Sequence, residues 1–286
     1  MKYLLKTLLI IVSLLHTQHV LSQWELTYSS NTYGTTGYSH FSFSSPQNGW
    51  EAHVHFGSAS GNDDLTISNT NDFGVSWSGS YHTFAQSITI GDLITSGNDT
   101  IYCFINYSYV GSCKYSYDSG NQWSTINMPG YGTWTMDAFP LSKDTILLTS
   151  GLGRLFKFTQ DSIYTLLKND SINFEESRIF FIDSNIGYIK AKDILNNNIL
   201  LFTDDGGYNF TTSCISVNYQ INDIYFTSDS VGYLCCSSGK ILKTIDYGVS
   251  FIELTTPTTN NLTYLQFIND SCGYCVGDNG TCIYTS

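Results

Sequence analysis

The sequence has little charge, few prolines and only two arginines. Asp, Glu, Lys and Arg make up 13% of the 286 residues, too little for a coiled coil, and 42% hydrophobic residues are too many for a disordered chain. Only four prolines occur, whereas Ser, Thr, Asn, Gly and Tyr are frequent. This composition favours many short strands joined by turns.

Beyond the N-terminus, no apolar run is long enough to cross a bilayer. At the N-terminus, Lys2 and Lys6 precede the run LLIIVSLL, and the small residue Ser22 follows, which is the order of a secretory signal. We expect a signal peptide over 1–22, cleaved near Ser22, and a single mature domain over 23–286. The protein is therefore expected to be secreted, periplasmic or on the cell surface, with no transmembrane segment in the mature chain.

Basic side chains are scarce in the predicted mature chain. Loss of the two leader lysines leaves 10 basic residues against 24 acidic ones. Such a surface repels nucleic acid and anionic membranes, so we expect neither as a partner.

Familiar enzyme motifs are also missing. The sequence contains no Gly-x-Ser-x-Gly, Walker or dinucleotide-binding motif, and we predict no cofactor. His53 and His55 share one face of a strand, but no third residue is fixed near them, so no metal site is predicted. Acidic residues outside the repeats that could form a catalytic pair are Glu51, Asp137, Glu175, Glu176 and Asp193.

An internal repeat dominates what is present. Four segments obey Ser/Thr-x-Asp-x-Gly-x-x-aromatic, and a fifth has lost the glycine and the aromatic residue. They are TNDFGVSW (70–77), SYDSGNQW (116–123), TDDGGYNF (203–210), TIDYGVSF (244–251) and the weaker TQDSIYTL (159–166). Their aspartates are 46, 43, 44 and 41 residues apart. Strand-rich repeats of this length predict the blades of a β-propeller.

Each repeat is expected to hold four antiparallel strands. Gly-Tyr or Gly-Trp marks the second strand, the aspartate motif joins the third to the fourth, and the motif's aromatic residue starts the fourth. The predicted starts of fourth strands are Trp24, Trp77, Trp123, Leu166, Phe210 and Phe251. The segment 23–30 resembles 250–257, so the chain begins on a fourth strand and ends on a third. We therefore predict an all-β, six-bladed propeller in which the N-terminal strand completes the C-terminal blade, with seven blades as the main alternative.

The motif resembles the Asp-box, or BNR, repeat of sialidases, other glycosidases, sortilin-type receptors and photosystem II assembly-factor-like propellers. GYLCCSSGKILKTIDYGVSF (232–251) is most similar to the last group. The resemblance covers nearly the whole mature chain and implies a propeller without fixing its function.

The motif residues are expected to be structural. The hydroxyl and carboxylate can bond nearby backbone N–H groups, glycine permits positive φ, and the aromatic ring packs beneath the turn. They are Asp72, Gly74 and Trp77; Asp118, Gly120 and Trp123; Asp205, Gly206, Gly207 and Phe210; and Asp246, Gly248 and Phe251.

A sialidase is excluded by arginine content. Sialidases bind the substrate carboxylate with three arginines, whereas this chain has only Arg154 and Arg178. No catalytic residue is assigned.

Eight cysteines in an exported chain suggest disulfides. Cys103 and Cys113 occupy the same positions in their repeat as Cys275 and Cys282 do in theirs. A four-residue turn at 277–280 would place Cys275 opposite Cys282, so we predict the bridges Cys103–Cys113 and Cys275–Cys282. The other four cysteines are left unpaired.

A ligand is expected on the face opposite the aspartate motifs. The longest aromatic connections on that face supply candidate contacts at Tyr33, Tyr38, Tyr131 and Trp134. We therefore expect a non-enzymatic binding or assembly propeller, and the resemblance to assembly-factor-like propellers implies a protein partner. The alternative is a propeller that binds or hydrolyses glycans.

Overall fold

A computed structural model describes most of the chain beyond residue 38. The described residues are 39–45, 47–55, 63–84, 87–97, 99–107, 110–130, 134–159, 162–269 and 271–285. The chain divides into two compact units, residues 1–127 (unit 1) and residues 128–286 (unit 2). The predictions for the leader, for the segment 23–30, and for Tyr33, Tyr38 and Tyr131 lie outside the described residues.

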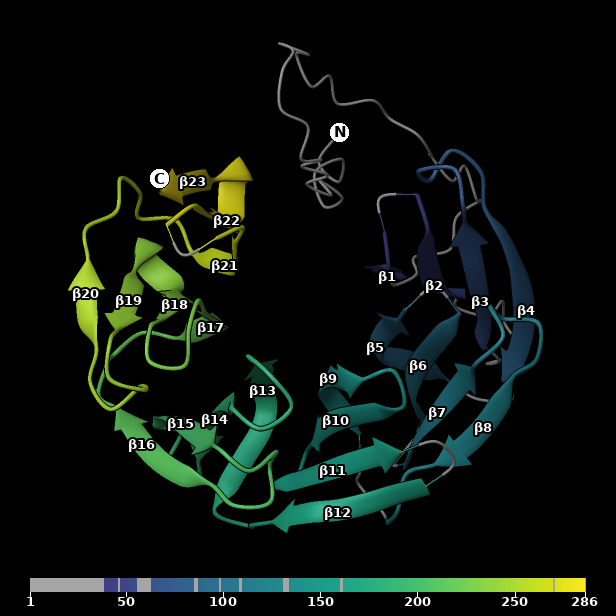
Figure 1. Cartoon of the computed structure of the whole chain (residues 1–286), viewed down its shortest axis with the longest axis horizontal. Helices are drawn as coiled ribbons and strands as arrows, with labels where there is room; N and C mark the ends of the chain where they lie inside the picture. Colours follow the sequence, from purple (N-terminus) through teal and green to yellow (C-terminus); the bar gives the residue numbers. More distant parts are fainter. Residues whose placement is uncertain are drawn as a thin grey trace. The chain divides into compact units, whose positions relative to one another are not determined.

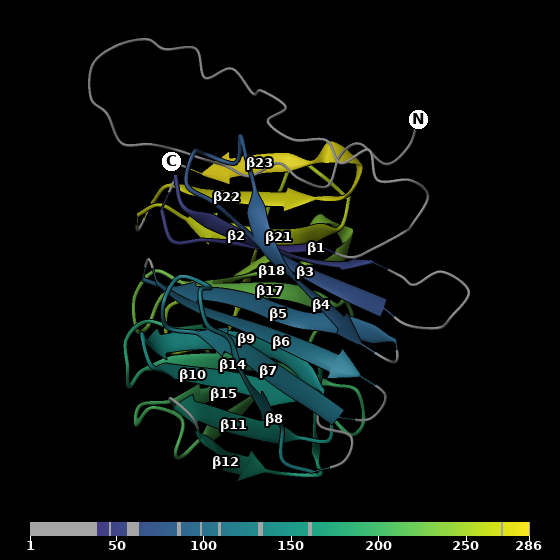
Figure 2. The ribbon, with the colours of Figure 1, turned by 90° about the vertical axis from the view of Figure 1, so that its right-hand side faces the viewer.

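Unit 1 holds two four-stranded antiparallel sheets whose strands follow chain order (Figures 1 and 2). The first consists of β1 (Ser39–Phe43), β2 (Gly49–His55), β3 (Asp63–Thr70) and β4 (Ser78–Phe84). The second consists of β5 (Ile88–Ser96), β6 (Thr100–Tyr107), β7 (Val110–Ser116) and β8 (Ser124–Asn127).

Unit 2 holds four more antiparallel sheets, again in chain order. The first is β9 (Thr135–Ser142), β10 (Thr145–Ser150), β11 (Arg154–Thr159) and β12 (Ser162–Lys168). The second is β13 (Ile172–Phe181), β14 (Gly187–Asp193), β15 (Asn198–Thr203) and β16 (Thr211–Ile215). The third is β17 (Ile221–Phe226), β18 (Gly232–Cys236), β19 (Ile241–Thr244) and β20 (Ile252–Leu254).

The last sheet of unit 2 has three strands among the described residues. It consists of β21 (Leu262–Phe267), β22 (Gly273–Gly277) and β23 (Cys282–Thr285). Two short 3₁₀ turns join strands, η1 (Ser237–Gly239) and η2 (Asp278–Gly280). Six sheets in the described part of the chain confirm the all-β, six-bladed class that the repeat predicts.

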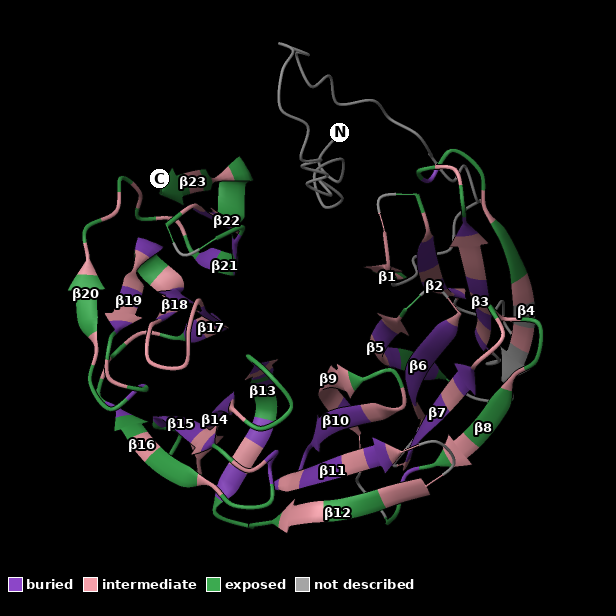
Figure 3. Cartoon of the chain, in the orientation of Figure 1, coloured by how far each residue is buried: buried purple, intermediate pink, exposed green. Residues whose placement is uncertain are grey.

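Within each unit, the core lies between successive sheets. Inner strands carry most of the buried side chains, and the fourth strands are largely exposed (Figure 3). In unit 2, Tyr188 and Phe226 from neighbouring sheets stack with ring centroids 3.5 Å apart. Burial of such aromatic surface is what holds one sheet against the next.

The four complete aspartate motifs form the same turn between the third and fourth strands. The Ser or Thr hydroxyl donates to the aspartate Oδ1 over 2.7–2.9 Å and accepts the motif glycine's N–H over 2.9–3.0 Å. The backbone N–H four residues after the aspartate donates to the same Oδ1 at 2.9 Å in all four turns. These aspartates are therefore turn residues.

Two consecutive residues of each turn adopt positive φ. The glycine has φ between 78° and 90°, and the preceding residue is also left-handed, including Phe73 at 64° and Tyr247 at 60°. Hydrogen bonds, led by those from the residue four positions later, lower the pKa of Asp72, Asp205 and Asp246 to about 2. The turns thus stabilise the ionised carboxylates.

The fifth, weaker motif behaves differently. Leu166 lies inside β12 and does not begin it, so its assignment as a strand start was wrong. The motif aromatics of the complete copies, such as Trp123 and Phe251, do stand directly before β8 and β20.

The predicted cysteine pairing was wrong by one residue. Cys113 lies opposite Phe104 rather than Cys103, and Cys282 lies opposite Val276 rather than Cys275. All eight cysteines are thiols. In the second hairpin, the connection that contains η2 is longer than the predicted four-residue turn, because Asn279 and Gly280 are both left-handed. A one-residue slip puts the two side chains on opposite faces of the sheet.

Candidate functional site

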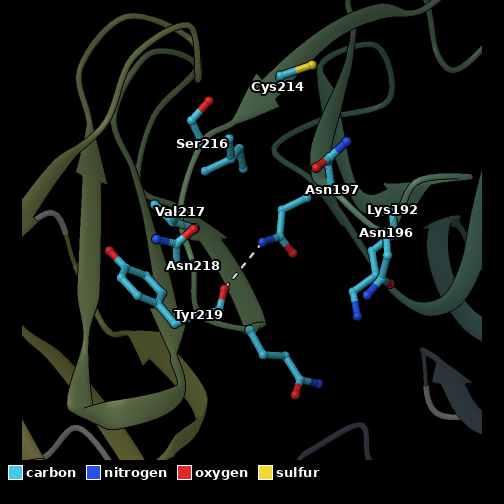
Figure 4. Close-up of a pocket in the computed structure, with 11 residues that line it drawn as sticks. Lys192, Asn196, Asn197, Cys214, Ser216, Val217, Asn218 and Tyr219 are labelled. Carbon is cyan, nitrogen blue, oxygen red and sulfur yellow. Dashed lines mark hydrogen bonds between the residues drawn. The ribbon is translucent and has the colours of Figure 1, made fainter.

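A groove of about 710 Å³ in unit 2 is the candidate site (Figure 4). It lies between the β14–β15 turn and the β16–β17 connection. Because strands alternate in direction, both segments lie at the sheet ends opposite the aspartate turns. We call it the amide groove, and its lining residues are Lys192, Asn196, Asn197, Asn198, Cys214, Ile215, Ser216, Val217, Asn218, Tyr219 and Gln220.

Asp193 builds one wall of the amide groove. Its Oδ1 accepts the backbone N–H groups of Leu195 and Asn197 at 2.8 and 2.9 Å, and its Oδ2 accepts the Asn197 side-chain amide at 2.8 Å. These bonds lower the pKa of Asp193, with the Asn197 side chain contributing most. The carboxylate is therefore used to fix the turn and present its asparagines.

The opposite wall is fixed to the next sheet of unit 2. The Gln220 N–H donates to Ser237 Oγ at 3.0 Å, and the Ser237 N–H donates to the Gln220 carbonyl at 2.8 Å. The Tyr219 hydroxyl donates to Glu253 Oε2 at 3.0 Å. Both walls are therefore held before any ligand arrives.

Asn198 lies at the base of the amide groove with an unused acceptor. Its Nδ2 donates to the Tyr219 carbonyl at 3.3 Å, drawn as the dashed line in Figure 4. Its Oδ1 is buried and accepts no hydrogen bond, and the whole residue is only 7% exposed. A buried acceptor without a partner costs about 1–3 kcal/mol, so this atom favours a ligand that brings a donor.

Two exposed apolar residues lie beside the groove. Ile194 and Leu195, at the tip of the β14–β15 turn, are 69% and 77% exposed. Their apolar surface faces solvent beside the polar groove.

Glu176 connects the groove to a charged cluster on β13 and β14. It pairs with Lys192 Nζ at 2.7 Å and accepts Gln220 Nε2 at 3.2 Å. The hydrogen bond from Lys192 is the main cause of its lowered pKa. Glu176 thus pairs with Lys192, the basic side chain that lines the groove.

Lys190 is the most deeply buried cation of this cluster. It is 1% exposed, and its Nζ donates to the Glu176 carbonyl. Burial lowers the pKa of Lys190 to about 8. Its amine is bonded to a backbone carbonyl, and no described residue near it suggests a catalytic arrangement.

Arg178 stands between two aspartates from neighbouring sheets. Its guanidinium lies 3.9 Å from Asp137 and 3.8 Å from Asp223. Asp137 Oδ2 also accepts the Ile179 N–H at 2.6 Å. The network ties β9, β13 and β17 together, so Asp137 joins sheets and is not free for acid–base chemistry.

The remaining predicted residues do not converge on one site. Trp134 is half-buried, and its carbonyl accepts the Gly151 N–H at 3.3 Å, away from the amide groove. His53 and His55 do share a strand face, with ring centroids 4.4 Å apart, but no group of three metal-ligating side chains occurs in the described residues. Within those residues no helix is long and apolar enough to span a bilayer.

Sequence reasoning missed the amide groove. The only signal is the run Asp193–Asn198, where an aspartate is followed by two apolar residues and three asparagines. Such a run reads as an ordinary turn until the neighbouring connection is placed against it.

The sheets and their strand order define a β-propeller. The chain is similar to a structure of YCF48 bound to a D1 peptide, with a TM-score of 0.61 and 13% identity over 88% of this chain and 92% of that one. It is also similar to the β-propeller domain of Cps50 (Swd1) from Myceliophteria thermophila, with a TM-score of 0.57 and 10% identity over 86% and 82% of the chains. The computationally designed protein Ika8 matches with a TM-score of 0.55 and 14% identity over 82% and 67%. No protein-family model matches the sequence, and no curated protein matches it either. These likenesses establish the fold.

Proposed function

We propose that this propeller is a non-enzymatic binding module that holds an extended polypeptide segment of a partner protein in the amide groove. The observation that carries the proposal is the buried, unpartnered Oδ1 of Asn198 at the base of a groove of about 710 Å³. A peptide N–H supplies the donor that this atom lacks.

The chemistry of the groove suits a peptide backbone. The exposed side-chain amides of Asn196, Asn197 and Asn218 offer both donors and acceptors, as a backbone needs. Ile194 and Leu195 are available to an apolar side chain of the ligand. Because Lys192 is already paired with Glu176, the ligand does not have to supply an acidic partner for it. The peptide in the YCF48 structure offers a precedent for the fold.

Export and family are part of the same proposal. We propose that residues 1–22 are a cleaved leader, that the chain works outside the cytoplasm, and that its turns are Asp-box repeats. N-terminal sequencing of the protein made in a secreting host tests export: a start near Gln23 supports it, and an intact Met1 contradicts it.

The binding test begins with an array of random dodecapeptides probed with the purified chain. Peptides that bind are then titrated against wild type and two groove variants. Asn198→Ala removes the acceptor and should weaken binding about tenfold, the effect of one hydrogen bond. Ser216→Trp fills the groove from an exposed position and should abolish binding while leaving the fold intact.

Asn121→Ala is the matched control, because it removes an exposed amide from an aspartate turn of unit 1. It should bind as wild type does. A glycan array probed in parallel separates the carbohydrate alternative: glycan binding lost in Ser216→Trp, with no peptide bound, would replace the peptide proposal.

A further inference from the structure

Cys235 and Cys275 occupy matching places on neighbouring sheets of unit 2. Cys235 on β18 pairs with Asp223 on β17, and Cys275 on β22 pairs with Leu265 on β21. The Leu265 N–H donates to Asp223 Oδ2 at 3.0 Å, which joins β17 directly to β21. The two cysteines therefore stand one strand outward from the same inter-sheet hydrogen bond.

Their side chains point into the same space. Cys235 and Cys275 belong to one buried cluster with Leu262, Leu265 and Phe267. The neighbouring Cys236 faces the other way and packs with Tyr188 and its surroundings, as alternation along a strand requires. Cys235 is 0% and Cys275 4% exposed, so the contact is dry.

The two thiols are neighbours within this buried cluster. A hydrogen bond with Cys275, followed by burial, raises the pKa of Cys235. Two thiols that share one buried cluster and stand at matching places on neighbouring sheets are candidates for a disulfide.

We propose that Cys235 and Cys275 are a disulfide-forming pair that joins the sheet β17–β20 to the sheet β21–β23 covalently. With a low-molecular-weight disulfide as oxidant, one thiolate attacks it, releases one thiol and forms a mixed disulfide. The second cysteine thiolate then attacks the protein sulfur and releases the second thiol. The pair loses two electrons and two protons, and the oxidant is reduced to two thiols. The inference is independent of any ligand in the amide groove.

The raised pKa and deep burial predict slow reaction in the folded chain, because the thiolate is the attacking species. The experiment therefore refolds the full chain in oxidised and reduced glutathione, blocks remaining thiols, and maps linkages by tandem mass spectrometry. We expect a Cys235–Cys275 cross-link, two fewer titratable thiols, and a higher thermal midpoint than the chain refolded with reductant.

Single variants assign the linkage. Cys236→Ala tests which of the two adjacent cysteines forms the bond, and this variant should keep the cross-link and the higher thermal midpoint. Cys235→Ala should lose both. Absence of the linkage in wild type, or its replacement by a Cys236 linkage, would overturn the proposal; neither result depends on a variant folding.

Discussion

Asp223 Oδ2 accepts the backbone N–H of Leu265 at 3.0 Å and thereby ties β17 to β21 across two sheets. Asp137 makes the same connection from β9 to Ile179 on β13, at 2.6 Å. In unit 2, a carboxylate on the first strand of one sheet thus satisfies a backbone donor of the next. The Arg178 guanidinium lies within 4 Å of both carboxylates and forms a salt bridge with each.

This relationship predicts a pH dependence of stability. Burial raises the pKa of Asp223 from 3.8 to about 6, against the opposing effects of the Leu265 hydrogen bond, Arg178 and Lys190. Between about pH 4 and pH 6 the unfolded chain loses this proton while the folded chain keeps it. The Asp223 contribution to the free energy of unfolding therefore falls with rising pH in that window, by about 1–3 kcal/mol, and is constant above it.

Asp223→Asn tests this by urea unfolding at pH 4, 5, 6 and 7. The difference between wild type and variant should shift in favour of the variant as the pH rises. A difference that stays constant across the series would show that Asp223 is not the titrating group.

A second prediction concerns the stability that the buried hydroxyl of each aspartate turn contributes. Thr244 is 1% exposed, and its Oγ1 accepts the N–H of Gly248 at 3.0 Å. Thr244→Val leaves this N–H unpaired and should cost about 1–3 kcal/mol of unfolding free energy. Thr244→Ser keeps the hydroxyl and should retain most of the stability. Equal losses in both variants would assign the effect to packing.

Glycine at the turn makes a third prediction. Gly248 has φ of 79°, and a Cβ there would lie 2.5 Å from Leu200 Cδ2. Gly280 has φ of 73° with nothing within 4 Å. Gly280→Ala should cost about 1–2 kcal/mol from the left-handed backbone alone, and Gly248→Ala should cost more. Thermal melts of the pair measure this, and a smaller loss at Gly248 would contradict it.

The closing strand remains a prediction. The sheet β21–β23 lacks a fourth strand in the described residues, and a cavity of about 530 Å³ lies beside Tyr233 and Phe267. Tyr233 occupies the Gly-aromatic position that Trp50 holds in unit 1, where Trp123 packs with ring centroids 6.2 Å away. We therefore expect an aromatic residue of the segment 23–30 to pack against Tyr233.

Trp24→Ala should therefore lower the free energy of unfolding by about 3–5 kcal/mol, as loss of a core tryptophan does. Tyr33→Ala, outside the predicted strand, is the control. Equal stability of Trp24→Ala and wild type would refute closure by this segment.

The fold was largely predictable from the sequence, because the repeat is local. Each turn from Thr244 to Gly248 carries its own hydroxyl, carboxylate and glycine, so the motif fixes the hairpin wherever it occurs. The cysteine pairing was not predictable from the sequence, because it depends on the register between paired strands. The left-handed Asn279 lengthens one connection by a residue and sends Cys282 to the other face.

The site was less predictable, because it is made by contacts between segments distant in sequence. Asn198 is informative only once the Tyr219 carbonyl takes its Nδ2 and leaves its Oδ1 unpaired. In the sequence Glu176 is a candidate catalytic carboxylate, whereas in the structure it is bonded to Lys192 and Gln220. A single sequence does not contain these pairings.

The most direct test of the binding proposal is a calorimetric titration of the purified chain with a dodecapeptide recovered from the array. We expect saturable one-to-one binding that weakens about tenfold in Asn198→Ala, disappears in Ser216→Trp and is unchanged in Asn121→Ala. Binding that both groove variants retain, or an array in which no peptide binds, would contradict it.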